Sequence, residues 1–187
     1  MNKIRMEPVQ TEEEIKTLAG LAHSIWHEYF PAILTEEQID YMVERFQSVS
    51  AMTQQIREQG YQYYFLAAEG QPAGYCGICP DGSKLFLSKL YLKKEHRGKG
   101  YASQAFAFLE EFCEKNGYEA IWLTVNRFNE ATIAAYKKKG FTIVGEQKAD
   151  IGHGFIMDDY VMEKALVERA KDERESDGKI RGLVYKK

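Results

Sequence analysis

The sequence predicts a single mixed α/β domain whose central sheet is mostly antiparallel. Apolar residues follow strand spacing in some segments and helix spacing in others. A glycine-containing loop joins a strand to a helix near the middle of the chain, and no linker rich in Pro, Gly or Ser interrupts it. With 187 residues, 44% of them hydrophobic, the chain is long enough to bury one well-packed core.

The N-terminal third predicts a strand followed by helices. Residues 4–9 are expected to form the strand, and Thr11 with Glu14 makes a capping box ahead of a helix that reaches Trp26. Two shorter helices are expected next, the first opened by a second box at Thr35, the other capped by Ser50 and ending near Gly60.

The middle of the chain predicts three antiparallel strands. Residues 61–68 and 73–79 are joined by a Gly- and Pro-containing turn, so they are expected to form a hairpin. Residues 84–92 follow an Asp-Gly turn signal and are rich in apolar and aromatic residues, which predicts the third strand.

The loop after this strand predicts an anion site. Two glycines let the backbone turn tightly, and the free N–H groups of the helix that begins near Ala102 and ends at Gly117 carry the positive end of its dipole. The spacing fits neither the P-loop of nucleoside triphosphatases nor the dinucleotide-binding fingerprint. The candidate residues are Arg97, Gly98, Lys99, Gly100, Tyr101, Ala102 and Ser103.

A second strand-helix unit follows the loop and its helix. Residues 119–125 predict a buried strand, and Asn129 is placed to cap a helix that carries Tyr136 and ends at Gly140. The basic residues 137–139 suit the negative end of that helix. Residues 141–146 and 155–164 supply two final strands.

These two units together resemble the GNAT superfamily of N-acetyltransferases. Residues 97–102 fit its R/Q-x-x-G-x-G/A loop, and residues 129–141 fit its N-x-x-A-x-x-x-Y-x-x-x-G-F segment. The resemblance implies a sheet of about seven strands, flanked by helices, in which the strands beside the loop-bearing helix splay apart. It also implies that acetyl-CoA lies between them, with its pyrophosphate on the loop amides and its pantetheine arm on backbone groups of Leu90 and Leu92.

The resemblance implies direct attack of an amine on the thioester. Backbone N–H groups near Leu90 would stabilise the oxyanion, and Tyr136 would protonate the departing thiolate. Asn129 has two interpretations, a cofactor contact and a helix cap. Tyr136 likewise has the alternative of packing on the sheet.

The general base is left open by the sequence. A lysine-like amine is neutral in only about one molecule in a thousand at pH 7.4, so some group must help to deprotonate it. A less basic amine, or proton release through a chain of waters, would need no dedicated base. Many relatives carry a glutamate on the strand before the loop, whereas residues 85–92 contain no acid. The remaining candidates are Glu95, His96, Asp158, Asp159, His153, Glu28 and His27.

An aromatic and acidic cluster ends the first predicted helix and is a candidate acceptor site. Trp26, Glu28 and Tyr29 suit a cationic or aromatic amine. The alternative is that Trp26 and Phe30 are core residues at helical spacing.

Composition narrows the function classes further. A net charge of −3 argues against a nucleic-acid surface, and no signal peptide or membrane span is evident, so we expect a cytoplasmic protein. Three cysteines argue for reduced thiols, and the C-x-x-C of Cys76 and Cys79 lies in a predicted strand, so no metal site is expected. A homodimer is left open.

The sequence thus predicts a catalytic domain over residues 1–164 and a charged extension over 165–187. The expected function is transfer of an acetyl group from acetyl-CoA to a primary amine of a small molecule, such as a polyamine or amino-acid derivative, or of a protein. Two alternatives stay open. One is a catalytically silent acyl-CoA-binding module of the same fold, and the other is a different acyl donor.

Overall fold

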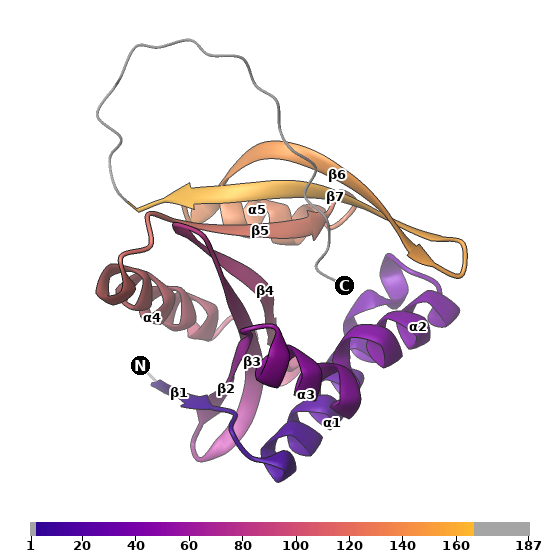
Figure 1. The fold of residues 1–187 in the computed structure, drawn as a ribbon, viewed down its shortest axis with the longest axis horizontal. Coiled ribbons are helices and arrows are strands. Elements are labelled where there is room, and N and C mark those ends of the chain that lie inside the picture. The colour runs from indigo at the N-terminus through magenta and orange to yellow at the C-terminus, as the bar shows by residue number, and fades with distance from the viewer. Residues whose placement is uncertain (1–2, 167–187) are drawn as a thin grey trace.

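The computed structural model describes residues 3–166 as one seven-stranded sheet with helices on both faces (Figure 1). The strand order is β1-β2-β3-β4-β5-β7-β6, and every neighbouring pair is antiparallel except β4 with β5, which confirms the predicted fold class. The elements are β1 (Ile4–Pro8), α1 (Glu12–Tyr29), the 3-10 turn η1 (Phe30–Ala32), α2 (Glu36–Gln47), α3 (Val49–Glu58), β2 (Gln62–Ala68), β3 (Gln71–Asp81), β4 (Lys84–Leu92), the 3-10 turn η2 (Lys94–His96), α4 (Tyr101–Asn116), β5 (Ala120–Asn126), α5 (Glu130–Lys138), β6 (Thr142–Gly152) and β7 (Phe155–Ala165).

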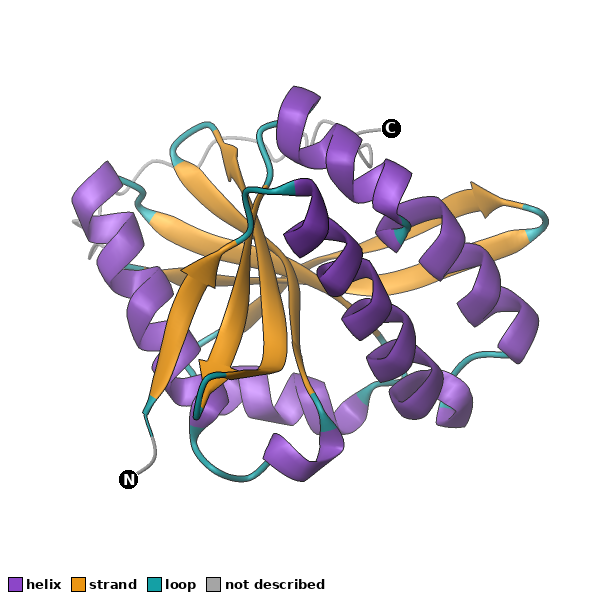
Figure 2. Ribbon diagram, turned by 90° about the horizontal axis from the view of Figure 1, so that it is seen from below, coloured by secondary structure: helices purple, strands orange, loops and turns teal. Residues whose placement is uncertain are grey.

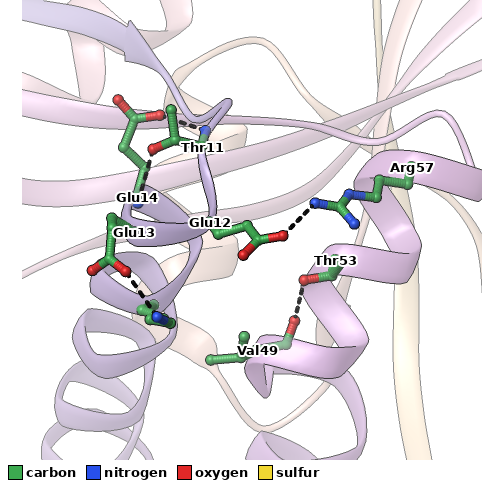
Figure 3. Close-up of polar contacts among 8 residues, drawn as sticks. Thr11, Glu12, Glu13, Glu14, Val49, Thr53 and Arg57 are labelled. Atoms are coloured by element: carbon green, nitrogen blue, oxygen red, sulfur yellow. Dashed lines mark hydrogen bonds and ion pairs between the residues drawn. The ribbon is translucent and has the colours of Figure 1, made fainter.

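The start of α1 is fixed by the predicted capping box (Figure 3). The Thr11 hydroxyl accepts from the Glu14 N–H at 3.2 Å, and the Glu14 carboxylate accepts from the Thr11 N–H at 2.8 Å. A cap of this kind stabilises a helix by about 1 kcal/mol. Glu12 in the same turn pairs with Arg57 at 3.0 Å, which ties the beginning of α1 to the end of α3.

The cap of α3 differs from the prediction. Thr35 caps α2 as expected by accepting from the Gln38 N–H, but Ser48, not Ser50, caps α3. Ser48 has an extended backbone and its hydroxyl accepts from the Ala51 N–H at 3.2 Å, whereas Ser50 already lies in the first helical turn. The helix therefore begins almost as soon as α2 ends.

The helices divide between the two faces of the sheet. In Figure 1, α4 lies on one side of β2–β4 and α1, α2 and α3 lie on the other. The largest core cluster packs α4 and Ile133 of α5 against the sheet, and a second cluster packs α1 and α3 against β2 and β3. A third cluster joins α1 and α2 to the β6–β7 hairpin, which extends beside α2 in Figure 2.

The sheet is nearly interrupted between β4 and β5. The parallel register covers only Lys84–Phe86 against Ala120–Trp122, although both strands continue beyond it. Between Gly77 and Ile78 of β3 the register skips Ser88, which is therefore the extra residue of a β-bulge in β4 in the same region. Bulges bend strands and increase their twist. The two strands therefore diverge toward the α4 N-terminus.

The last hairpin is longer than predicted. β6 runs to Gly152, six residues beyond the predicted end at 146, because it pairs with β7 along most of its length. β7 ends at Ala165, and the rest of the predicted charged extension, from residue 167, lies outside the described residues.

Cys76 and Cys79 lie in β3 as predicted, and the three cysteines are free and buried. Between residues 3 and 166, no group of three His, Cys, Asp or Glu side chains is arranged to hold a metal ion. None of the helices described is long and apolar enough to cross a membrane.

Candidate active site

A cavity of about 530 Å³ opens where β4 and β5 diverge. Most of the residues that the sequence singled out line it, together with side chains of α1, α2, α5 and β7. The predicted site residues in its lining are Trp26, Tyr29, Leu90, Leu92, Arg97, Gly98, Gly100, Tyr101, Ala102, Ser103, Asn129 and Tyr136. Glu28 and Lys99 are exposed and lie outside this lining.

The backbone of β4 directs hydrogen-bonding groups into the divergence. The Lys93 N–H donates to the Ala73 carbonyl at 2.9 Å, so the backbone N–H and C=O of Lys93 point toward β3. In an antiparallel pair, the backbone groups of successive residues point alternately toward and away from the neighbouring strand. The N–H and C=O of Leu90 and Leu92 therefore point away from β3. Because β5 has separated from β4 at this level, these are the groups that an extended ligand would meet.

The loop that follows β4 opens α4 without a side-chain cap. Gly98 and Gly100 have φ of +73° and +80°, which only glycine adopts without strain. The N-cap is Gly100, and the first turn contains no acidic residue. The N–H groups of Tyr101, Ala102 and Ser103 therefore begin the helix with its positive dipole end uncompensated, which is the arrangement that binds anions.

Lys139 adds a second positive charge at this helix terminus. Its Nζ donates to the Ser103 hydroxyl and it lines the same cavity. The sequence assigned Lys139 only to the end of α5, because its distance from Ser103 depends on how α5 packs beside α4. The fold thus gives the anion site a lysine that the loop motif does not contain.

The Arg97 side chain contacts the end of β4 and the end of α1. Its Nε donates to the Leu92 carbonyl at 3.0 Å, and its guanidinium lies 3.4 Å from the Glu28 carboxylate and 5.1 Å from the centre of the Tyr29 ring. Since the Leu92 carbonyl is engaged by Arg97, the group that Leu92 presents to the cavity is its N–H. Arg97 therefore joins the end of α1 to the loop.

Asn129 occupies the N-cap position of α5 but does not cap it. Its side chain makes no capping bond, which corrects the predicted helix-cap role. The Tyr29 hydroxyl instead donates to the Asn129 side-chain oxygen at 3.0 Å and lies 2.8 Å from the Thr132 hydroxyl. Asn129 is drawn into this contact by Tyr29, and the result is a bridge between α1 and α5.

Tyr136 lies between the core and the cavity. Its ring packs against Phe106 and Phe141, with ring centres 6.1 and 5.7 Å apart. Burial raises the pKa of Tyr136, and Tyr29 and Cys76 add to this rise. The phenol therefore remains protonated through the neutral range and is a proton donor.

The first helix contributes a buried aromatic wall. Trp26 is 5% exposed, and its indole N–H donates to the Tyr75 hydroxyl at 3.1 Å, so the core interpretation of Trp26 is correct even though the residue also lines the cavity. Around it, this end of the cavity is mainly apolar. Its further lining residues include Phe30, Leu34, Met42, Phe46, Tyr91 and Met157.

The structure separates the candidates for the general base. His27 pairs with Asp40, whose carboxylate raises the pKa of His27. Asp159 is 1% exposed and lines the cavity, and it is the sole carboxylate in that lining within residues 3–166. The other candidates lie outside the lining: Asp158 pairs with Arg127, Glu28 with Arg97, His153 packs on Tyr41, and Glu95 and His96 belong to η2.

Lys89 is a cavity residue that the sequence analysis missed. It extends from β4, and its Nζ donates to the Ser88 hydroxyl at 2.9 Å. Burial lowers the pKa of Lys89 to about 8, while the Asp159 carboxylate acts in the opposite direction. Nothing in the local sequence marks this lysine, because its environment is created by β7, 70 residues further along the chain.

Comparison with known proteins places this chain in a family. A model of the acetyltransferase (GNAT) family matches residues 20–141. An uncharacterized N-acetyltransferase from the pepI 3' region of Lactobacillus delbrueckii subsp. lactis is 24% identical over 165 residues, covering 84% of this chain and 95% of that protein. Streptothricin acetyltransferase of Streptomyces lavendulae is 27% identical over 86 residues, covering 45% of this chain and 46% of that one.

Solved structures share the fold. The PaiA N-acetyltransferase of Thermoplasma acidophilum, crystallised in complex with coenzyme A, superposes with a TM-score of 0.72 at 23% identity, covering 87% of this chain and 99% of that one. The family match extends over more than half of the chain and includes both motifs on which the resemblance was based. The chain therefore belongs to the GNAT family of acetyltransferases and is an acyltransferase.

Proposed function

We propose that this protein transfers the acetyl group of acetyl-CoA to a primary amine by direct attack in a ternary complex. The observation that carries the proposal is the divergence of β4 from β5 next to the uncapped start of α4. Together these features offer backbone amides to an extended arm and a positive helix terminus to its phosphates. The cofactor-binding residues are the predicted ones that line the cavity, with Lys139 added to the phosphate end.

Stabilisation of the oxyanion and protonation of the departing thiolate each have a suitable group in the cavity. The Leu90 N–H stabilises the oxygen of the thioester as negative charge develops on it. Tyr136, with its raised pKa, donates a proton to the departing sulfur. Holding amine and thioester together removes most of the entropic barrier, so no covalent enzyme intermediate is needed.

The acceptor enters the half of the cavity formed by α1, α2 and β7. Aromatic and aliphatic side chains dominate this half, and Asp159 is its carboxylate among the described residues. A monoamine on an apolar or aromatic body fits that lining better than a polyamine, which needs several negative charges. The acceptor is a small molecule or an exposed amine of a protein.

A second candidate is an acyl-CoA-binding module without turnover. The observation in its favour is that β4 lacks the carboxylate that many relatives carry there. Turnover separates the two functions, and a panel of acyl-CoAs of increasing chain length identifies the donor.

The test begins with cofactor binding. Acetyl-CoA at about a hundred times its Kd is expected to stabilise the protein by roughly 2.7 kcal/mol, which for this chain length raises Tm by about 5–10 °C. Gly100→Glu, which places bulk and negative charge at the start of α4, is expected to abolish the shift. Thiol release from acetyl-CoA is then screened against monoamines, polyamines and peptides. No shift in the wild-type protein at millimolar acetyl-CoA would contradict the function.

A further inference from the structure

The acceptor half of the cavity contains two charged side chains from different strands, Lys89 of β4 and Asp159 of β7. Asp159 pairs in register with Asn126 of β5, so β7 brings it to the side of the divergence opposite β4. The Coulomb attraction of Asp159 acts on Lys89 across the cavity. The charge on Asp159 therefore influences the protonation of Lys89 in the region where β4 and β5 separate.

The direction of Lys89 follows from the strand. Leu90 and Leu92 pack on the core cluster beneath α4, whereas Tyr91 packs with the clusters of α1 and α2 on the other face. Lys89 and Tyr91 are two residues apart on the strand, so their side chains lie on the same face of the sheet. Its neighbour Leu90 presents the N–H proposed to bind the thioester oxygen, which places Lys89 beside the reacting groups on the acceptor side.

Within residues 3–166, the other ionisable groups of the cavity leave Lys89 with a single carboxylate neighbour, Asp159. Tyr61 approaches from the segment after α3, and Tyr29, Tyr91 and Tyr136 approach from α1, β4 and α5. Burial raises the pKa of Tyr61 and of Tyr136, so neither phenol adds a negative charge. Arg97 and Lys139 are engaged elsewhere, Arg97 with Glu28 and Lys139 with Ser103 at the start of α4.

We propose that Lys89 accepts the proton of the acceptor ammonium and that Asp159 is the positioning residue that offsets the charge Lys89 then carries. This assignment rests on the proposed function. It assigns the role of base to a lysine of β4, a strand that contains no carboxylate. Among the described residues, Asp159 is also the group in this half of the cavity that would attract an ammonium ion.

The protons and electrons balance. The ammonium gives one proton to the Lys89 amine, which leaves a neutral nucleophile and a Lys89–Asp159 ion pair. The nucleophile's lone pair forms the new C–N bond, and the C–S bond breaks with its electrons on sulfur. The second proton of the attacking nitrogen replaces the one that Tyr136 gives to the thiolate. Lys89 returns its proton to water when the products leave.

Lys89 is a better match for this step than Asp159. An efficient base has a pKa near the working pH, and the pKa of Lys89, about 8, meets that condition. Asp159 is the anion whose attraction favours the protonated form of Lys89. Asp159 therefore acts through Lys89, and its loss is expected to lower the pKa of Lys89 further.

The experiment compares wild-type protein with Lys89→Met, Lys89→Arg and Asp159→Asn. Lys84→Met is the matched control, because Lys84 lies on the same strand but pairs with Glu163 and does not line the cavity. The pH dependence of kcat/KM is measured with an amine found in the acceptor screen. In parallel, NMR follows the ¹³Cε resonances of labelled lysines from pH 6 to 11, and the resonance missing from Lys89→Met identifies Lys89.

The expected wild-type kcat/KM rises to a plateau near pH 8, and the Lys89 resonance titrates near the same pH. Lys89→Met and Lys89→Arg are each expected to lose about 100-fold or more in kcat/KM at pH 7.4, with the remaining activity rising up to the pKa of the free amine. Asp159→Asn is expected to move the rise to lower pH, and Lys84→Met to leave the profile unchanged.

Three results would overturn the assignment. Lys89 could titrate near 10.4, Lys89→Met could keep wild-type kcat/KM, or Lys89→Arg could keep it, which would make Lys89 a fixed cation for an acidic acceptor. The acetyl-CoA thermal shift verifies that each variant folds. A wild-type protein that shows that shift but acetylates no amine would overturn the transferase function instead, while normal turnover in Lys89→Met would overturn only the role of Lys89.

Discussion

At the scale of single residues, Tyr136 combines burial with access to the cavity. Its ring is fixed between Phe106 and Phe141, so the direction of its hydroxyl is set by core packing. Burial raises its pKa above the ordinary phenol value. The protonated form is therefore present below that raised pKa, and the donor persists through the whole neutral and mildly basic range.

Tyr136→Phe is expected to lower kcat by one to two orders of magnitude, or about 1.4–2.7 kcal/mol, because the thiolate then leaves without its proton donor. The Kd of acetyl-CoA is expected to change little, since the ring remains. Steady-state kinetics and calorimetric titration give the two numbers. An unchanged kcat would mean that Tyr136 serves packing alone.

At the scale of elements, the end of α1 is joined to both halves of the cofactor site. Glu28 pairs with Arg97 of the loop, and Tyr29 bonds Asn129 at the start of α5. The sequence predicted that these α1 residues bind the acceptor, and that role stays a prediction. Their contacts connect them first to residues proposed to hold the cofactor. A carboxylate beside a phosphate-binding arginine opposes anion binding.

Glu28→Gln is therefore expected to tighten acetyl-CoA binding by about twofold to fivefold at low salt, a modest gain because the pair is partly exposed. The gain is expected to shrink in 0.5 M salt. Calorimetry at both salt concentrations measures it. Glu44→Gln, the same change at an exposed position of α2, is the control. A raised KM for the amine with an unchanged Kd for acetyl-CoA would instead support the acceptor role.

At the scale of the whole molecule, a buried polar chain joins two helices to the centre of the sheet. The Trp26 N–H of α1 donates to the Tyr75 hydroxyl of β3, which in turn donates to the Gln47 side-chain oxygen of α2. Tyr75 and Gln47 are both fully buried. Water cannot replace these partners, so the chain fixes how the acceptor half is assembled on the sheet.

Tyr75→Phe is expected to reduce the free energy of unfolding by about 2–4 kcal/mol, because it leaves a buried donor and a buried acceptor without this partner. Urea denaturation measures the loss as a lower midpoint at constant m. Tyr64→Phe removes a hydroxyl that bonds the exposed Gln62 side chain, and is expected to cost less than about 0.5 kcal/mol. Equal stabilities of the two variants would argue against the network.

The elements that the sequence predicted well are those defined by neighbouring residues. The capping box of Thr11 and the strand over residues 84–92 depend on spacing alone, and both lie where predicted. The prediction that Ser50 caps α3 was wrong because Ser48 and Ser50, two residues apart, offer the same local signal.

Features that depend on distant residues could not be predicted in this way. Asn129 is turned from its helix by Tyr29, 100 positions away, and the environment of Lys89 requires both a bulge in β4 and the register of β7. The loop motif predicted which residues form the start of α4 and the candidate anion site, a role that stays a prediction, but the position of Lys139 beside them depends on helix packing. Local patterns therefore predicted the parts of the candidate site, and tertiary packing determined which side chains meet.

The short pairing between β4 and β5 also bears on which part of a thioester the scaffold recognises. The strand edge left open at Leu90 and Leu92 is complementary to an amide-bearing carrier arm, whatever acyl group that arm delivers. On the proposed function, main-chain groups of β4 would bind the carrier arm, and the few side chains around the sulfur would contact the acyl group. Substitutions at those side chains can change which acyl group is transferred, while the means of holding the carrier stays the same.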